Sequence, residues 1–185
     1  MTALKFLIKT WGCQMNALDS EKLTGTLLAL GYEPTEDEAE AQVILLNTCS
    51  VREGPKNKVF DELGRLKPLK RGKLQVLGVV GCVAQQEKAH IFKRAPFVDL
   101  VMGPRGMLHL PELLEQARHQ KALETEFRED AILYPDQKIH RAHPVKAFVT
   151  VMEGCNKKCA YCIVPATRGA EIYRPLQSIL DEARR

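Results

Sequence analysis

The segment EGCNKKCAYCIVP, residues 153–165, places three cysteines at C-x3-C-x2-C spacing: Cys155, Cys159 and Cys162. Soft thiolate ligands select zinc, copper or iron–sulfur clusters. A closed, structural zinc site is coordinated by four ligands, and a [4Fe–4S] cluster normally takes four cysteines, one for each iron. Three thiolates therefore leave one iron with an open coordination position, and an open position is where a substrate can bind. The spacing predicts a reactive metal centre rather than a structural one.

The other three cysteines, Cys13, Cys49 and Cys82, each follow a short apolar run. If these runs are parallel strands, the loops beyond their carboxyl ends share one edge of the sheet. Gly12 and Gly81 each precede a cysteine, which indicates tight turns and close approach of the backbone to a ligand. We therefore expect a shared three-thiolate site. The alternative is three separate buried thiols that behave as small hydrophobic groups.

Strands and helices must alternate to position these cysteines. Continuous apolar runs are typical of buried parallel strands; they lie at residues 4–10, 41–47, 74–80 and 97–103. Helical patterns separate them: one begins at an Asn16 N-cap and stops at Gly31, and the others end near Pro68, begin at Ala84 and begin at Pro111. The alternation predicts an α/β fold, with an open parallel sheet and flanking helices.

The alternation of strands and helices stops at residues 121–143, which are charged and suit a linker. VKAFVTVM, residues 145–152, predicts a new strand, and RPLQSILDEARR predicts a helix with proline in its first turn. We assign residues 1–120 to an N-terminal α/β domain, 121–143 to the linker, and 144–185 to the first strand–helix unit of a second, truncated domain.

Composition is that of an ordinary globular protein, with 45% hydrophobic and 27% charged residues. No apolar run approaches the roughly 20 residues that cross a bilayer, and the N-terminus lacks the features of a signal peptide. We therefore expect a cytoplasmic protein with no membrane partner. Thiols stay reduced there, so six cysteines indicate metal or redox chemistry. A net charge of +4 permits a nucleic-acid partner without requiring one.

Four stretches that include all six cysteines resemble the methylthiotransferases, specifically the MiaB-type tRNA branch. They are TWGCQMNALDSEK, NTCSVRE, GCVAQQE and EGCNKKCAYCIVPATRG. The last also resembles the signature of radical S-adenosylmethionine enzymes, including the aromatic Tyr161 before its final cysteine. The ribosomal-protein branch typically has proline where this chain has Gln14. The threonylcarbamoyladenosine branch typically has Lys-Val-Asn at positions 14–16.

The resemblance implies two [4Fe–4S] clusters and S-adenosylmethionine as cofactors. The auxiliary cluster would be held by Cys13, Cys49 and Cys82, and the cluster that binds S-adenosylmethionine by Cys155, Cys159 and Cys162. Gly154 and Tyr161 would shape the S-adenosylmethionine pocket. The implied reaction is radical methylthiolation at C2 of N6-isopentenyladenosine, 3′ to the anticodon of tRNA. An electron donor of flavodoxin or ferredoxin type is implied, and we expect a monomer and a second domain that begins as a partial (β/α) barrel.

Two further groups match the family pattern: Arg168, Gly169, Glu171 and Arg174 in one, and Asn16, Asp19 and Glu21 in the other. Tyr173 replaces the serine that is usual in the first group. For Arg168 and Glu171, we give equal weight to two interpretations: an ion pair on the surface, and a contact with substrate or cofactor. We interpret the second group as capping residues of a helix N-terminus.

Several alternatives remain open. A related methylthiotransferase could act on threonylcarbamoyladenosine in tRNA or on a ribosomal protein. A non-enzymatic zinc or nucleic-acid-binding module would use a Cys3His site with His140 or His143. Members of the family also carry further barrel strands and a small RNA-binding domain, so we expect this chain alone to be inactive.

Overall fold

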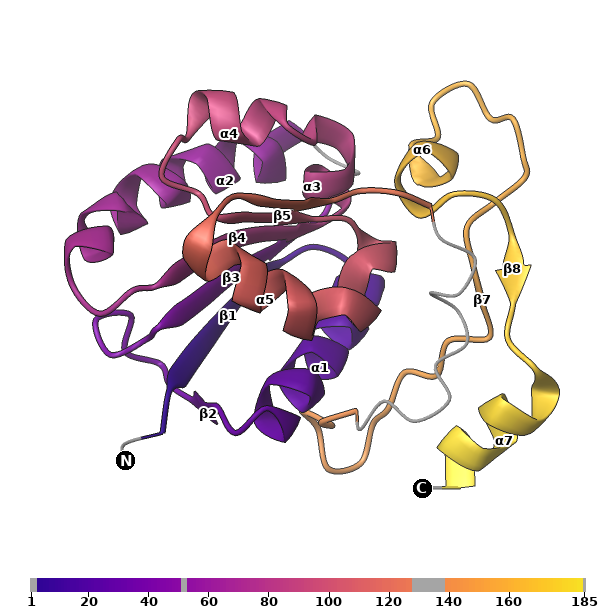
Figure 1. The fold of residues 1–185 in the computed structure, drawn as a ribbon. Coiled ribbons are helices and arrows are strands. Elements are labelled where there is room, and N and C mark those ends of the chain that lie inside the picture. Colours follow the sequence, from indigo (N-terminus) through magenta and orange to yellow (C-terminus); the bar gives the residue numbers. More distant parts are fainter. Residues whose placement is uncertain (1–2, 51–52, 128–138, 185) are drawn as a thin grey trace.

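A computed structural model describes residues 3–50, 53–127 and 139–184 (Figure 1). Six strands form one sheet in the order β2-β1-β3-β4-β5-β6, and every neighbouring pair is parallel. The strands are Lys5–Trp11 (β1), Glu33–Pro34 (β2), Val43–Thr48 (β3), Val76–Gly81 (β4), Leu100–Met102 (β5) and Ala122–Glu124 (β6). The predicted α/β fold with an open parallel sheet is confirmed.

The strand order changes direction at β1, because β2 lies on one side of it and β3 on the other. Ligands of open parallel sheets bind beyond the carboxyl ends of the strands at such a reversal. β1 and β3 end side by side there, with Trp11 opposite Thr48. Cys13 and Cys49 follow these two ends, and Cys82 follows the next strand, β4.

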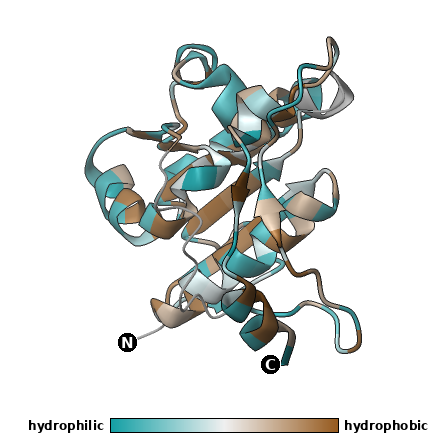
Figure 2. Ribbon diagram, turned by 90° about the vertical axis from the view of Figure 1, so that its right-hand side faces the viewer, coloured by the Kyte–Doolittle hydropathy of each residue, from teal (hydrophilic) through white to brown (hydrophobic). Residues whose placement is uncertain are grey.

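Helices cover both faces of the sheet (Figure 1). One layer holds α1 (Gln14–Ala29) and α5 (Leu110–His119), and the other holds α2 (Glu53–Leu66), α3 (Cys82–Glu87) and α4 (His90–Arg94). Two 3-10 helices, η1 (Lys67–Arg71) and η2 (Pro104–His109), complete the connections. Each layer buries its own apolar cluster against the strands, and the hydrophobic colour of Figure 2 concentrates on the central sheet and on the helix sides that face it.

The start of α1 differs from the predicted one. Cys13, not Asn16, is the N-cap, with an extended backbone at φ −100°. The Asn16 side chain instead reaches back and accepts the Cys13 backbone N–H at 3.2 Å. The predicted stop is confirmed, because α1 ends at Ala29 and Gly31 takes a φ of 83° just beyond it.

Two other elements also depart from the sequence analysis. The helix predicted from Ala84 begins at Cys82 and breaks at Lys88, whose positive φ of 49° separates α3 from α4. Within the predicted linker, β6 pairs with β5 and completes the edge of the sheet. Backbone groups at a sheet edge favour such pairing even in a short strand. The domain boundaries themselves stay a prediction.

The strand predicted at residues 145–152 is formed only at its end. Met152–Glu153 (β7) pairs antiparallel with Ile172–Tyr173 (β8). A strand needs neighbours that satisfy its backbone groups, and in the part of the chain that is described β7 meets only β8. The predicted last helix is confirmed as α7 (Leu176–Arg184), and a short helix, α6 (Val164–Arg168), precedes it.

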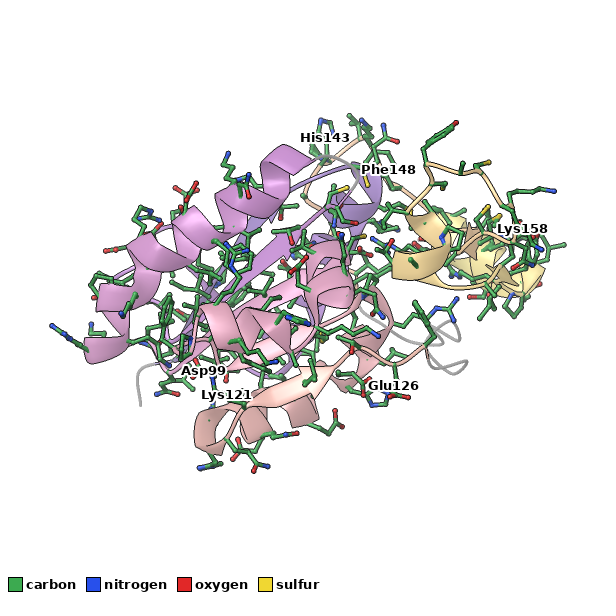
Figure 3. All side chains as sticks on the ribbon, turned by 90° about the horizontal axis from the view of Figure 1, so that it is seen from above. Asp99, Lys121, Glu126, His143, Phe148 and Lys158 are labelled. Atoms are coloured by element: carbon green, nitrogen blue, oxygen red, sulfur yellow. The ribbon has the colours of Figure 1, made fainter. Side chains whose placement is uncertain are left out.

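The segment from β7 onward lies at the carboxyl side of the sheet, where α6 contacts α3 and η2 (Figure 1). Figure 3 shows Lys158, which lies between Cys155 and Cys159 in the sequence, on the opposite side of the molecule from Asp99 and Lys121. Asp99 and Lys121 precede β5 and β6 and so mark the amino edge of the sheet. Among the described residues, no helix has the length and apolar character to cross a membrane.

Candidate functional site

The first cysteine trio lines one cavity. Cys13, Cys49 and Cys82 border a space of about 220 Å³ at the carboxyl edge of the sheet. The remaining walls come from α1, β7, the cysteine loop and α6: Met15, Met152, Glu153, Gly154, Ile163, Val164, Thr167 and Arg168. The three cysteines thus border one space, as expected of loops that follow parallel strands. Their role as metal ligands stays a prediction.

A buried amide pair holds two of these cysteine loops together. Asn47, near the end of β3, donates from Nδ2 to the Asn16 carbonyl at 2.9 Å and to Ser20 Oγ at 2.8 Å. Its Oδ1 accepts a hydrogen bond from Asn16 Nδ2 at 3.1 Å. Asn16 Oδ1 in turn accepts from the backbone N–H and the thiol of Cys13, at 3.2 and 3.3 Å. The first turn of α1 is thus tied to the carboxyl end of β3, and Cys13 to Cys49.

Gly81 makes room for this arrangement. Its φ of 88° lies in the left-handed region that favours glycine. A β-carbon there would lie 2.6 Å from Asn47 Oδ1, and one at Gly12 would lie 2.8 Å from Cys49 Cβ. The backbone at Gly12 and Gly81 thus approaches protein atoms of α1 and of the end of β3 closely. The expected approach to a ligand stays a prediction.

The second trio lies in the loop between β7 and α6. The Cys155 backbone N–H donates to the Gly169 carbonyl at 3.0 Å, and the Cys162 N–H donates to the Cys159 carbonyl at 3.1 Å. Cys159 is exposed, whereas the other two cysteines are half-buried. Because this loop starts beside the cavity of the first trio, the two sets of thiols lie on the same side of the sheet (Figure 1).

Gly154 and Tyr161 differ in how they are placed. Gly154 has a φ of 80°, and a β-carbon on it would lie 2.0 Å from the Ala170 carbonyl oxygen. It also lines the cavity. The Tyr161 side chain is 94% exposed and buries almost none of its surface. That these two residues shape a cofactor pocket stays a prediction.

The three cysteines of the first cavity carry the soft donor atoms that iron–sulfur clusters take. Within the described ranges, no three His, Cys, Asp or Glu side chains stand close enough to hold one metal ion. Among these described residues, neither His140 nor His143 stands in such a group. A [4Fe–4S] cluster binds each thiolate through a different iron, so its cysteines stand farther apart. Soft thiol donors around a cavity with apolar walls suit such a group at Cys13, Cys49 and Cys82.

A buried ion pair links this cavity to α1. Arg168, 5% exposed, donates from Nη2 to Asp19 Oδ2 at 2.5 Å. The surface pair with Glu171 is therefore not formed, and Asp19 is no capping residue. Burial opposes the charge on Arg168, yet Asp19 and then Cys82 raise the pKa of its guanidinium well above the ordinary value. A fixed positive charge thus borders the cysteine cavity.

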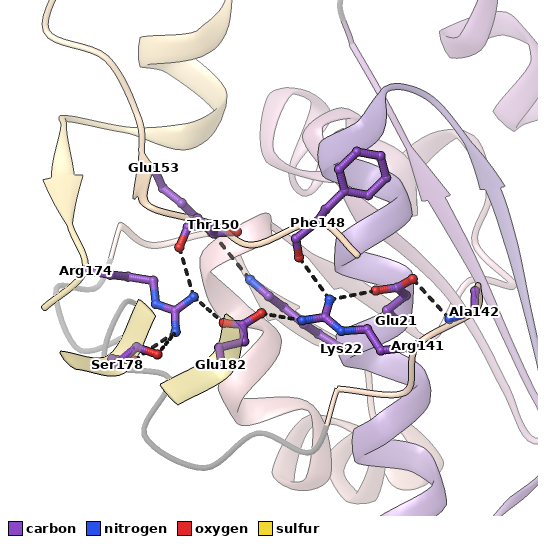
Figure 4. A network of polar contacts seen from close by, with 10 residues as sticks. All are labelled: Glu21, Lys22, Arg141, Ala142, Phe148, Thr150, Glu153, Arg174, Ser178 and Glu182. Carbon is purple, nitrogen blue, oxygen red and sulfur yellow. Dashed lines mark hydrogen bonds and ion pairs between the residues drawn. The ribbon is translucent and has the colours of Figure 1, made fainter. Parts of the chain in front are cut away.

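A second polar network joins α1 to the last helix (Figure 4). Arg141 donates to Glu21 Oε2 at 3.1 Å and to Glu182 Oε1 at 2.6 Å. Glu182 also accepts from Arg174 Nη1 at 2.5 Å, and Arg174 donates to the Thr150 carbonyl at 2.9 Å. Glu21 is therefore not a capping residue either: it binds the chain that follows position 139.

The ion pair between Lys22 and Glu153 was not predicted from the sequence. Lys22 is 2% exposed, and its Nζ lies 3.8 Å from Glu153 Oε1. Burial is the main cause that lowers the pKa of Lys22, and Glu153 and then Asp19 counteract it. Asp19 and Lys22 stand three residues apart and share one face of α1. That polar stripe on a helix with apolar residues elsewhere was the signal in the sequence.

Glu171 serves the cysteine loop itself. Its Oε1 accepts the backbone N–H of Asn156 at 3.3 Å, and its own N–H donates to Asn156 Oδ1 at 3.1 Å. Tyr173, which replaces the usual serine, donates its hydroxyl to Glu171 Oε2 at 3.0 Å. Glu171 is the main cause that raises the pKa of Tyr173 above its ordinary value. The Tyr173 hydroxyl thus helps to hold the carboxylate that binds the cysteine loop.

Comparison with known proteins places these features in a family. A chain from Vibrio vulnificus is 50% identical over 186 residues, which is 96% of this chain and 38% of that protein. A Sulfurihydrogenibium protein is 50% identical over 183 residues, 97% of this chain and 42% of its own length. Both are called tRNA-2-methylthio-N(6)-dimethylallyladenosine synthase. This chain thus spans about two fifths of the length of these relatives.

The family model described as "Uncharacterized protein family UPF0004" matches residues 5–103. This range runs from β1 to just past β5 and includes Cys13, Cys49 and Cys82. It covers more than half of the 185 residues. The chain therefore belongs to the UPF0004 family.

Proposed function

We propose that this chain is part of a radical S-adenosylmethionine enzyme that adds a methylthio group to C2 of N6-dimethylallyladenosine in tRNA. The observation that carries the proposal is the shared cavity of Cys13, Cys49 and Cys82, which Gly154 of the second cysteine loop also lines. The similarity to the named synthases supports the same substrate.

Each trio would hold one [4Fe–4S] cluster, the first at Cys13, Cys49 and Cys82 and the second at Cys155, Cys159 and Cys162. When bound, the clusters and S-adenosylmethionine would supply the one-electron and group-transfer chemistry that no side chain can provide at an aromatic C–H bond. A flavodoxin- or ferredoxin-type donor would supply the electron. We infer that the enzyme acts as a monomer in the cytoplasm.

The chain's own residues would prepare the site. Met15, Met152 and Ile163 line the cavity with apolar surface and would exclude water from it. Arg168 places a buried positive charge beside the cavity, where it would attract an anionic group bound there. Gly154 lets the start of the second loop approach the cavity, because a side chain there would collide with the Ala170 carbonyl.

The test is the set of modified nucleosides in tRNA from a strain that lacks the gene. We expect the 2-methylthio nucleoside to disappear and N6-dimethylallyladenosine to accumulate in mass spectra of digested tRNA. The whole gene should restore the modification, and so should a version with the surface change Lys73→Ala, whereas Cys49→Ala should not. Unchanged nucleosides would contradict the proposal. A change confined to threonylcarbamoyladenosine or to a ribosomal protein would redirect it to those substrates.

A further inference from the structure

Two buried arginines tie residues 168–170 to the sheet domain. Arg105, on η2 of the sheet domain and 3% exposed, donates from Nη2 to the Ala170 carbonyl at 2.8 Å. Arg168, two residues before Ala170 on α6, pairs with Asp19 on α1. Gly169 lies between the two anchor points, and a β-carbon on it would lie 3.0 Å from the Arg105 guanidinium.

The second cysteine loop rests on this same stretch. The Cys155 N–H donates to the Gly169 carbonyl at 3.0 Å. The backbone at Gly154 packs so closely that a β-carbon would lie 2.5 Å from the Gly169 oxygen and 2.0 Å from the Ala170 oxygen. The carbonyl that Arg105 binds is therefore in direct contact with the start of the loop. A displacement of residues 169–170 would be passed on to Cys155.

The orientation of Arg105 is itself fixed. Its guanidinium lies 5.4 Å from the centre of the Phe127 ring, at a distance suited to a cation–π contact. Gly103, two residues before it, N-caps η2 and donates its N–H to the Glu124 carbonyl of β6 at 2.7 Å. The arginine thus extends from a 3-10 helix whose N-cap residue is hydrogen-bonded to the edge strand β6.

We propose that Arg105 and Arg168 form a reciprocal latch that positions the second cysteine loop against the cavity of the first trio. Both are positioning residues, because they act on the loop through residues 169–170. Hydrogen bonds from a buried guanidinium are about twice as strong as neutral ones. The consequence for catalysis rests on the proposed function, whereas the latch itself does not. None of this requires a bound metal.

Hydrogen exchange followed by mass spectrometry tests the latch. The exchange of backbone amides is measured on the whole reduced protein, before and after anaerobic incubation with iron and sulfide. We expect Arg105→Gln to speed exchange in peptides spanning residues 153–163 at least tenfold, with no change in β3 and β4. Arg105→Lys, which keeps the charge, should give a smaller increase. The matched control is Arg118→Gln. Arg118 lies on α5, and its guanidinium donates to Glu115 on the same helix and to the Tyr32 hydroxyl, with no contact to the loop among those described. It should leave residues 153–163 unchanged.

Equal exchange at residues 153–163 in Arg105→Gln and Arg118→Gln would overturn the latch. So would a loss of protection spread evenly over β3 and β4, since that would make Arg105 a general stabilising residue. Failure of the proposed function is separable from this result. A protein that binds no iron would refute the enzyme assignment, while the exchange rates before iron addition would still decide the latch.

Discussion

Asn47 is the residue whose loss should most clearly uncouple Cys13 from Cys49. It is fully buried and makes three hydrogen bonds, two to Asn16 and one to Ser20. The replacement Asn47→Leu keeps a similar volume and removes all three. Since a typical hydrogen bond adds about 1 kcal/mol net, we expect the free energy of unfolding to fall by roughly 3 kcal/mol.

Thr48→Val is the matched control. Thr48 is the next residue of β3, is equally buried, and makes one long hydrogen bond to the Val80 carbonyl at 3.3 Å. Its loss should lower the free energy of unfolding by about 1 kcal/mol or less. Urea denaturation followed by far-UV circular dichroism measures both. With a slope of about 2 kcal/mol per molar urea, the midpoint should fall by roughly 1.5 M for Asn47→Leu and at most about 0.5 M for Thr48→Val.

The amide link would be refuted if Asn47→Leu were no more destabilising than Thr48→Val. A second readout is the rate at which a thiol reagent modifies Cys49, which is 5% exposed in the native fold. We expect faster modification in Asn47→Leu and an unchanged rate in Thr48→Val, both below the urea concentration that begins to unfold the protein. Equal rates would show that the Cys49 loop does not depend on this amide.

Three further predictions concern other contacts. Arg168→Met leaves the Asp19 carboxylate buried without its partner, so the free energy of unfolding should fall by about 3–5 kcal/mol. Adding Asp19→Leu should recover part of that loss. A double variant whose loss of stability equals the sum of the two single losses would contradict the ion pair. Arg65 is the main cause that lowers the pKa of Glu38 from 4.5 to about 2. This stabilisation is complete above pH 4.5 and is lost as the pH falls toward 2, so over that interval the Tm should drop more steeply in the wild type than in Glu38→Gln; parallel curves would count against it. Gly154→Ala forces a β-carbon to within 2.0 Å of the Ala170 oxygen at a positive φ, so thiol labelling of Cys155 should become several-fold faster, and an unchanged rate would contradict the close packing.

The sheet and the first cysteine trio could be predicted because both follow from local patterns. Apolar runs such as residues 41–47 mark buried parallel strands, and loops after parallel strands share one edge whatever their distance in sequence. The strand order was not predictable, because it depends on which strands pair, and neighbouring apolar runs carry no such information.

The polar stripe on α1 is visible in the sequence, but its partners in the chain after position 139 could not be predicted. Asp19 and Arg168 stand 149 residues apart, and neither spacing nor helix propensity links them. A surface interpretation of Arg168 was reasonable, since arginine is rarely buried unless it is paired. The break at Lys88 was hidden for a different reason: α3 and α4 together read as one helical pattern, and a positive φ at lysine has no local signature.

The iron and sulfide content of the anaerobically reconstituted protein tests the central claim most directly. Two trios that each hold a four-iron cluster predict about eight irons per chain. Replacing Cys13, Cys49 and Cys82 together by alanine should remove half of this iron and leave the remainder. Zinc without sulfide, or an iron content that the triple replacement does not change, would contradict the account.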